Sequence, residues 1–210
     1  LEGRIVSIDA MGCQRKIASK IAEKKADYVL SLKGNQTTMH TEVALFLNDA
    51  KANGFKDIPH DSLVTVEKDH GRIEKREYHI TSDIAWFADK EDWKNLRSFG
   101  MVTSHRTIGE VTTVDTRFFI SSLPAEAKVF AEAVRGHWSV ENQLHWTLDV
   151  VFREDDSRIR KDNGPANFAI LLRLALSLCK QEKTAKIGIH GRRLSAGWDD
   201  DDLELLIGGI

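Results

Sequence analysis

Apolar and polar positions follow one another differently in successive parts of this chain, and the first part predicts a strand–helix–strand unit. Ile5–Ile8 is a short β-branched run, residues 14–25 place apolar side chains at helical spacing, and Asp27–Leu32 is a second apolar run. Two strands joined by a helix of about a dozen residues run parallel, with a right-handed crossover. The sequence therefore predicts a βαβ unit at the start of the chain.

A small polar group stands at the carboxyl ends of the two predicted strands. Asp9 comes after the first strand, and Lys33, Asn35 and Gln36 come after the second. Ligands of parallel α/β sheets collect beyond the carboxyl ends of the strands. We therefore expect a carboxylate and three polar side chains at one edge of the sheet. A helix cap or a turn is the alternative role for Asp9, and a turn for the other three.

After a helix predicted for Thr37–Ala52, the period of the apolar positions changes from that of a helix to that of strands. Four runs between residues 62 and 122 favour strands, namely Leu63–Glu67, Arg76–Thr81, Ser98–Ser104 and Asp115–Ser121. His70, Gly71 and Arg72 form a plausible turn between the first two. This part of the chain is predicted to be a mainly antiparallel block.

The last part of the chain is predicted to be helical. A long segment with helical spacing extends from about Ala125 to Phe152, just after Pro124, and Ala166–Cys179 is a strongly apolar helix. The acidic run Asp199–Asp202 precedes a last short apolar stretch. Because carboxylates favour the positive end of a helix, we interpret this run as a cap and not as a metal site.

Within the long helical segment, two imidazoles flank a carboxylate. A repeat of 3.6 residues places His137, Glu141 and His145 on one side of a helix, with Trp138 and Asn142 beside them. Polar groups of this kind are costly to bury without partners, which makes this stretch a candidate for chemistry. A zinc site built on the two histidines and the glutamate is one alternative, and histidines held by hydrogen bonds in a core are another.

Composition and charge restrict the class of protein. The chain has 210 residues, 41% of them hydrophobic, and a formal net charge of −2, so any phosphate-binding surface must be local. The sequence contains neither an apolar run of membrane-spanning length nor a secretory signal pattern. Cys13 and Cys179 are too few for a disulfide framework and are predicted to be buried thiols. A cytoplasmic protein fits these features.

Asp9 and Glu141 together suggest metal-dependent phosphoryl transfer. A carboxylate at the end of a strand is rigidly held, and Mg²⁺ is commonly bound by one or two carboxylates together with substrate phosphate and water. If the long helix packs beside the first strand, Glu141 reaches the same ions as Asp9. Two such ions activate a water or a 3′-hydroxyl group and stabilise the leaving oxygen.

Several motifs, in this order along the chain, resemble bacterial insertion-sequence transposases of the DDE class, in particular the group with the H-repeat-associated proteins. The motifs are Val6–Gln14, Lys33–Gln36, His70–Arg72 with Glu74 and Arg76, His137–Asn142, Leu148–Val150 and Glu154–Asp156. The resemblance implies an α/β, RNase H-like partial fold consisting of a βαβ unit and C-terminal helices, with an inserted β-rich block. It implies residues 1–52 as a partial core, 53–123 as the insertion and 124–210 as the helical part.

The resemblance also implies roles for individual residues. Asp9 is the second acid of the DDE triad and Glu141 the third, and both are ligands of Mg²⁺ or Mn²⁺. His137, Asn142, His145 and Asp149 are supporting residues. The expected contacts with DNA phosphate come from Lys33, Asn35, Gln36, His70, Arg72, Arg76 and Arg135.

The first acid of the triad belongs to an earlier strand that this sequence does not contain. The expectation is therefore a C-terminal fragment of a transposase that cuts and joins DNA, inactive when alone, acting on element ends and target DNA. A homodimer in the synaptic complex is a further expectation. The alternative is a non-catalytic remnant that binds DNA or another partner.

Overall fold

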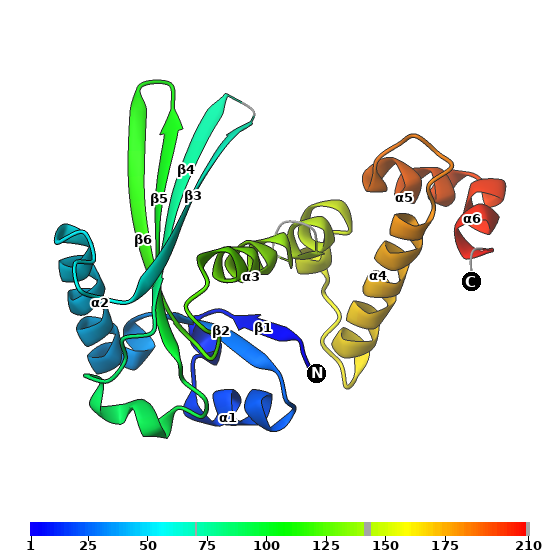
Figure 1. Ribbon diagram of the computed structural model, residues 1–210. Helices are drawn as coiled ribbons and strands as arrows, with labels where there is room; N and C mark the ends of the chain where they lie inside the picture. The colour runs from blue at the N-terminus through cyan, green and yellow to red at the C-terminus, as the bar shows by residue number, and fades with distance from the viewer. Residues whose placement is uncertain (70, 141–143, 209–210) are drawn as a thin grey trace. The chain divides into compact units, whose positions relative to one another are not determined.

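The computed structural model describes residues 1–69, 71–140 and 144–208, which form two compact units, residues 1–137 and 138–210 (Figure 1). The first unit is built on a mixed sheet of six strands in the order β1-β2-β6-β5-β4-β3. Its strands are β1 (Ile5–Ile8), β2 (Asp27–Leu32), β3 (His60–Asp69), β4 (Arg72–Thr81), β5 (Ser98–Ile108) and β6 (Val111–Ser121). Its helices are α1 (Arg15–Glu23), α2 (Thr37–Ala52) and most of α3 (Ala127–Val140).

The predicted βαβ unit is present. Strands β1 and β2 pair in parallel, with Ile5 opposite Asp27, and α1 connects them. Every other neighbouring pair in the sheet is antiparallel, as predicted for the strand-rich block. The block is continuous with the βαβ unit, because β6 pairs with β2 through residues such as Ile120 and Leu30. One sheet therefore spans both parts of the sequence.

The two faces of this sheet carry different elements. Opposed residues share a face, so Leu30, Ile120 and Phe99 lie on one face. That face, here called the α2 face, packs in one apolar cluster with α1, α2 and the segment before β5. The buried members include Ala18, Ile21, Leu30, Leu32, Val43, Leu47, Phe87, Trp93, Phe99, Met101 and Ile120. Cys13, in the same cluster, is a buried free thiol as predicted.

The opposite face of the sheet, here called the α3 face, receives helix α3. The ring of Phe130 on α3 contacts Tyr78 and Phe119 edge-on, with centroids 6.3 and 5.5 Å away. Between these two aromatic residues lies Gly100 on β5, which pairs with both Ile80 and Phe119. A Cβ atom at Gly100 would lie only 2.5 Å from Cζ of Phe130. Glycine at this position therefore allows the helix to approach the sheet closely.

The second unit is helical. It contains α4 (Gly164–Gln181), α5 (Ile189–Trp198) and α6 (Asp200–Ile207), with a core of Leu148, Val151, Phe152, Leu176, Cys179 and Leu206. The side chain of Asp199 accepts a hydrogen bond from the backbone N–H of Asp201, which confirms the predicted helix cap. No helix of the two described units is both long and apolar enough to cross a lipid bilayer.

The described part of the segment predicted from about Ala125 to Phe152 is helical, but not all of it is α-helix. The α-helix runs from Ala127 to Val140, and Thr147–Val151 is a π-helix, followed by Arg153 with a φ angle of 56°. A π-helix has about one residue more per turn than an α-helix. Asp149 lies in this π-helix, so a repeat of 3.6 residues does not apply across Thr147–Val151.

A first prediction concerns the charged link between α2 and the sheet. Lys51 on α2 and Lys75 on β4 lie 2.9 and 2.7 Å from the carboxylate of Glu77, and Lys51 also donates to Thr103. Hydrogen bonds from the two lysines lower the pKa of Glu77 from 4.5 to about 2. The Glu77 carboxylate binds a proton more weakly in the folded protein than in the unfolded chain. The stabilisation by its ion pairs with the lysines is therefore complete above the unfolded pKa and disappears as the pH falls toward 2.

We expect Glu77→Gln to lower the free energy of unfolding at pH 7 by about 1–2 kcal/mol, the lysines being partly solvated. The variant should also show a weaker dependence of stability on pH between about 5 and 2. Urea unfolding at several pH values measures both effects. Glu110→Gln, an exposed change in the β5–β6 turn, is the control and should leave the pH profile unaltered. Identical pH profiles for Glu77→Gln and the unchanged protein would contradict the assignment.

A second prediction concerns the contact between Phe130 and Gly100. Gly100→Ala places a methyl group inside the van der Waals radius of the ring, so α3 must shift or the ring must leave its position. We expect a loss of about 1–3 kcal/mol in the free energy of unfolding. Gly136→Ala, on α3 itself, has no atom within 4 Å of the new Cβ and should be neutral or stabilising. Equal stability of Gly100→Ala and the unchanged protein would refute the close approach.

Candidate functional site

Asp9 lies just beyond the end of β1, where the backbone is still extended before the 3₁₀ turn Ala10–Gly12. Ile5 and Ser7 are on the α3 face of the strand, and the alternation of side chains continues to Asp9. The carboxylate is more than half exposed, and its Oδ1 lies 3.3 Å from Nζ of Lys33. It is therefore an accessible anion held at a defined strand end.

The surroundings of Asp9 favour its ionised form. Its pKa lies below the usual value, first because the backbone N–H of Ala10 donates to it and then because of the nearby Lys33 ammonium and His137, with partial burial opposing. Asp9 therefore remains a carboxylate at neutral pH, the form that a hard cation requires.

The polar side chains predicted at the edge of the sheet do lie beside Asp9. Lys33 forms the ion pair with Asp9, Asn35 donates to the carbonyl oxygen of Ala10 at 2.6 Å, and Gln36 donates to that of Cys13 at 3.0 Å. The two amides thus tie the loop after β2 to the loop after β1. The predicted contacts of these three residues with DNA stay predictions, but the structure gives Asn35 and Gln36 a definite role in holding the Asp9 loop.

Helix α3 passes beside β1 on the α3 face. A cavity of about 400 Å³ between the two elements is lined by Ile5, Ser7, Val129, Glu132, Ala133 and Gly136. His137, in the next position of the helix, is close enough to Asp9 to influence its pKa. Helix α3, which carries His137, therefore reaches the end of the strand that precedes Asp9.

The other candidate residues of the central motif lie either outside the described residues or in the second unit. Glu141 and Asn142 lie outside the described residues, and so does His70 at the β3–β4 turn. His145 and Asp149 are exposed residues of the second unit. Among the described residues, no group of three His, Cys, Asp or Glu side chains could hold a metal ion. The zinc alternative includes Glu141, so it stays untested.

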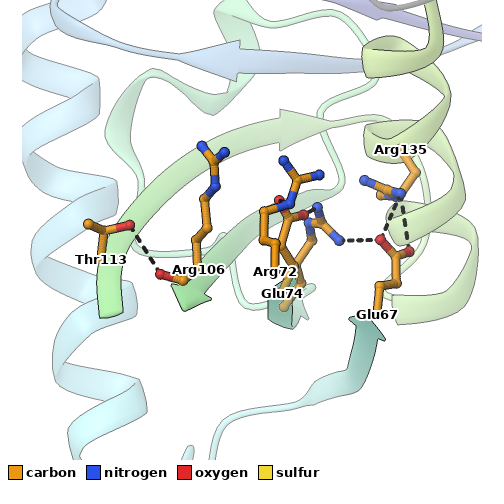
Figure 2. Close-up of polar contacts among 7 residues, drawn as sticks. Glu67, Arg72, Glu74, Arg106, Thr113 and Arg135 are labelled. Carbon is orange, nitrogen blue, oxygen red and sulfur yellow. Dashed lines mark hydrogen bonds and ion pairs between the residues drawn. The ribbon is translucent and has the colours of Figure 1, made fainter. Parts of the chain in front are cut away.

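A second cluster of charged residues lies on the α3 face of the long hairpins (Figure 2). Arg72 and Arg76 on β4 both pair with Glu74, and Arg76 also contacts Glu67 on β3 at 2.8 Å. Arg135 on α3 contacts the same Glu67 carboxylate at 3.0 Å. The structure thus joins three predicted DNA-binding arginines in one network, which links the hairpins to α3.

Sequence reasoning missed Glu67 and Arg106 as members of this cluster. Cross-strand pairing places Glu67 opposite Glu74, and Glu74 opposite Arg106 on β5. These three residues form one row across the sheet. The sequence signal for a charged face is the alternation of charged with apolar or hydroxyl residues in each strand. The alignment of the row depends on the register of three strands, however, and the sequence does not specify that register.

Comparison with known proteins confirms the resemblance to transposases. The family model described as "Transposase DDE domain" matches residues 1–178. "Putative transposase YncI" from Escherichia coli O157:H7 is 41% identical over 198 residues, which cover 92% of this chain and 50% of that protein. "H repeat-associated putative transposase YhhI" from Escherichia coli strain K12 is 34% identical over 215 aligned positions, covering 100% of this chain and 56% of that protein.

This chain therefore spans about half the length of the curated relatives that it matches. The family match nevertheless covers most of its residues and includes β1, the hairpins and α3. The strand-end acid and the adjoining helix are thus parts of a shared domain. On this evidence the chain belongs to the transposase DDE domain family.

Proposed function

We propose that this chain is part of a transposase that cuts and joins DNA by metal-dependent phosphoryl transfer. The observation that carries the proposal is that α3 passes beside β1, the two elements lining one cavity, and that His137 on α3 is close enough to Asp9 to lower its pKa. The sequence motif that contains His137 also contains Glu141, and the family resemblance gives Glu141 the role of the next acid. The two acids would then act on one phosphate group.

The residues present fit a divalent cation. Asp9 offers an exposed, ionised carboxylate on a rigid strand end, and Mg²⁺ or Mn²⁺ prefers such oxygen ligands. Asp9 and Glu141 would hold the ions, which when bound stabilise charge on the attacking and leaving oxygens. Lys33 neutralises Asp9 in the structure and would be able to turn to a phosphate group instead. Asn35 and Gln36 would keep the Asp9 loop in position.

The fold proposed for the intact domain is RNase H-like. It is supported by the parallel pair β1–β2, by β6 running antiparallel beside β2, and by the acid at the end of β1. Residues 53–123 would be the insertion and residues 124–210 the helical part that follows it. The DNA contacts would come from Lys33, Arg72, Arg76 and Arg135, with His70 at the hairpin turn.

The decisive test uses the protein as its gene encodes it, assayed for nicking and strand joining on DNA that carries the element ends, with Mg²⁺ or Mn²⁺. We expect Asp9→Asn and Glu141→Gln each to lower the rate by about a hundredfold or more, because each removes a ligand whose ions supply several kcal/mol. Glu42→Gln, an exposed acid on α2, should retain full activity.

Two results would overturn the proposal. One is full activity of both Asp9→Asn and Glu141→Gln. The other is salt-dependent DNA binding by the encoded protein without any metal-dependent cleavage, which would favour the non-catalytic alternative.

A further inference from the structure

The long hairpins present two faces of different chemistry. On the α3 face, successive cross-strand rows place Arg72, Arg76 and Arg106 near one another, and α3 adds Arg135. On the α2 face of the same hairpins, Val64, Val66, Ile73 and Val114 are exposed at 42–66% of their surface. The α2 face also carries the cations Lys68 and Lys75, but the arginines gather on the α3 face, which is therefore the candidate phosphate-binding surface.

The cluster on the α3 face, here called the arginine face, consists of Arg72, Arg76, Arg106 and Arg135 with Glu67 and Glu74. Four guanidinium groups and two carboxylates give it a net charge of about +2, although the whole chain has a formal net charge of −2. The cluster is thus locally positive on a chain whose net charge is slightly negative. A local basic surface of this kind attracts the phosphate backbone of nucleic acids.

Arg106 is the member of the arginine face that internal structure does not explain. Its row partner Glu74 is already bonded to Arg72 and Arg76, and Glu67 is shared by Arg76 and Arg135. Among the described residues, Arg106 forms no ion pair, and its side chain is exposed on β5. Figure 2 shows its guanidinium group standing beside that of Arg72 on the same side of the sheet.

We propose that the arginine face binds the phosphate backbone of double-stranded DNA, with Arg106 as the anchoring side chain. This inference rests on the proposed function and identifies which surface of the hairpins carries the DNA. Guanidinium groups bind phosphate oxygens in a planar, two-bond geometry, which favours arginine at such contacts. Glu74 and Arg76, whose side chains are largely buried, keep their ion pair and hold the face in position, and a phosphate group replaces the half-exposed Glu67 as the partner of Arg135 when DNA binds.

The arginine face and the candidate site both involve α3. Arg135 and His137 lie two residues apart on this helix but on different sides of it, Arg135 paired with Glu67 on the hairpins and His137 close enough to Asp9 to affect its pKa. Helix α3 therefore takes part both in the arginine face and in the surroundings of Asp9. An acidic protein surface would find the same arginines but would gain nothing from their proximity to Asp9, so DNA is the favoured partner.

The test measures binding of a short mixed-sequence DNA duplex to the 210-residue chain by fluorescence anisotropy, with EDTA present and at several salt concentrations. Arg106→Ala should weaken binding by about three- to tenfold and reduce the slope of log affinity against log salt by about 0.9, the value for one phosphate contact. Lys68→Ala is the matched control, because Lys68 is an exposed cation on the α2 face of β3. It should change affinity by less than about twofold.

Glu67→Gln gives the opposite sign and guards against effects of misfolding. Removing one carboxylate releases Arg76 and Arg135 from a competing partner, so binding should become about two- to threefold tighter, with a steeper salt dependence. A variant that merely damages the fold would weaken binding instead. The thermal unfolding of all three variants is measured beside the binding.

Three outcomes would overturn the arginine face. They are equal weakening by Arg106→Ala and Lys68→Ala, absence of duplex binding by the unchanged chain, and binding of polyglutamate with the same dependence on Arg106. None of them involves metal or cleavage. Loss of strand joining in Asp9→Asn together with any of these results would leave the proposed function in place and reject this surface alone.

Discussion

The packing of one aromatic ring on one glycine determines how this domain is assembled. Phe130 lies over Gly100, with Tyr78 and Phe119 on either side, and only the missing Cβ lets the ring come so close. Because α3 is fixed at this point, its later residues have defined neighbours. Arg135 meets Glu67 on β3, and His137 lies near Asp9. The candidate active site and the arginine face therefore both depend on a contact between apolar groups.

Charge is arranged in the same way at the two sites. At the end of β1 the anion is Asp9, and the Lys33 ammonium 3.3 Å away stabilises it. On the hairpins the cations predominate, and Glu67 and Glu74 stabilise them. The Asp9–Lys33 and Glu67–Arg135 pairs are about half exposed, and an exposed ion pair contributes about 1 kcal/mol or less, whereas Arg76 and Glu74 are largely buried. Exchange of an internal partner for a metal ion or a phosphate group therefore costs little at the two exposed pairs.

The sequence predicted local structure well where the spacing of apolar residues follows a single repeat, that of a helix or that of a strand. The bounds of β1, β2 and α2 agree with the prediction to the residue, because each element has an apolar side facing one core. The hairpin strands are longer than predicted, since the parts of them that leave the core mix charged and hydroxyl residues with isolated exposed apolar ones. The π-helix at Thr147–Val151 could not be predicted, because one added residue per turn scarcely alters so short a pattern. Asp9 and its polar neighbours were found because strand ends can be recognised locally. Arg106 was not found, because the row of charged residues that contains it depends on the register of three strands.

The continuity of the sheet gives the arginine face a fixed relation to Asp9. Strands β5 and β6 pair without a break from Ile108 and Val111 at the turn to Ser98 and Ser121. The last residues of β6 then pair with β2, which pairs with β1. A ladder of backbone hydrogen bonds thus connects the hairpins to the strand that carries the acid, and α3 joins them a second time across the α3 face. Two independent connections between the same elements resist both sliding and bending. A duplex that contacts the arginine face is therefore positioned relative to the strand end by the scaffold itself, without rearrangement of the first unit.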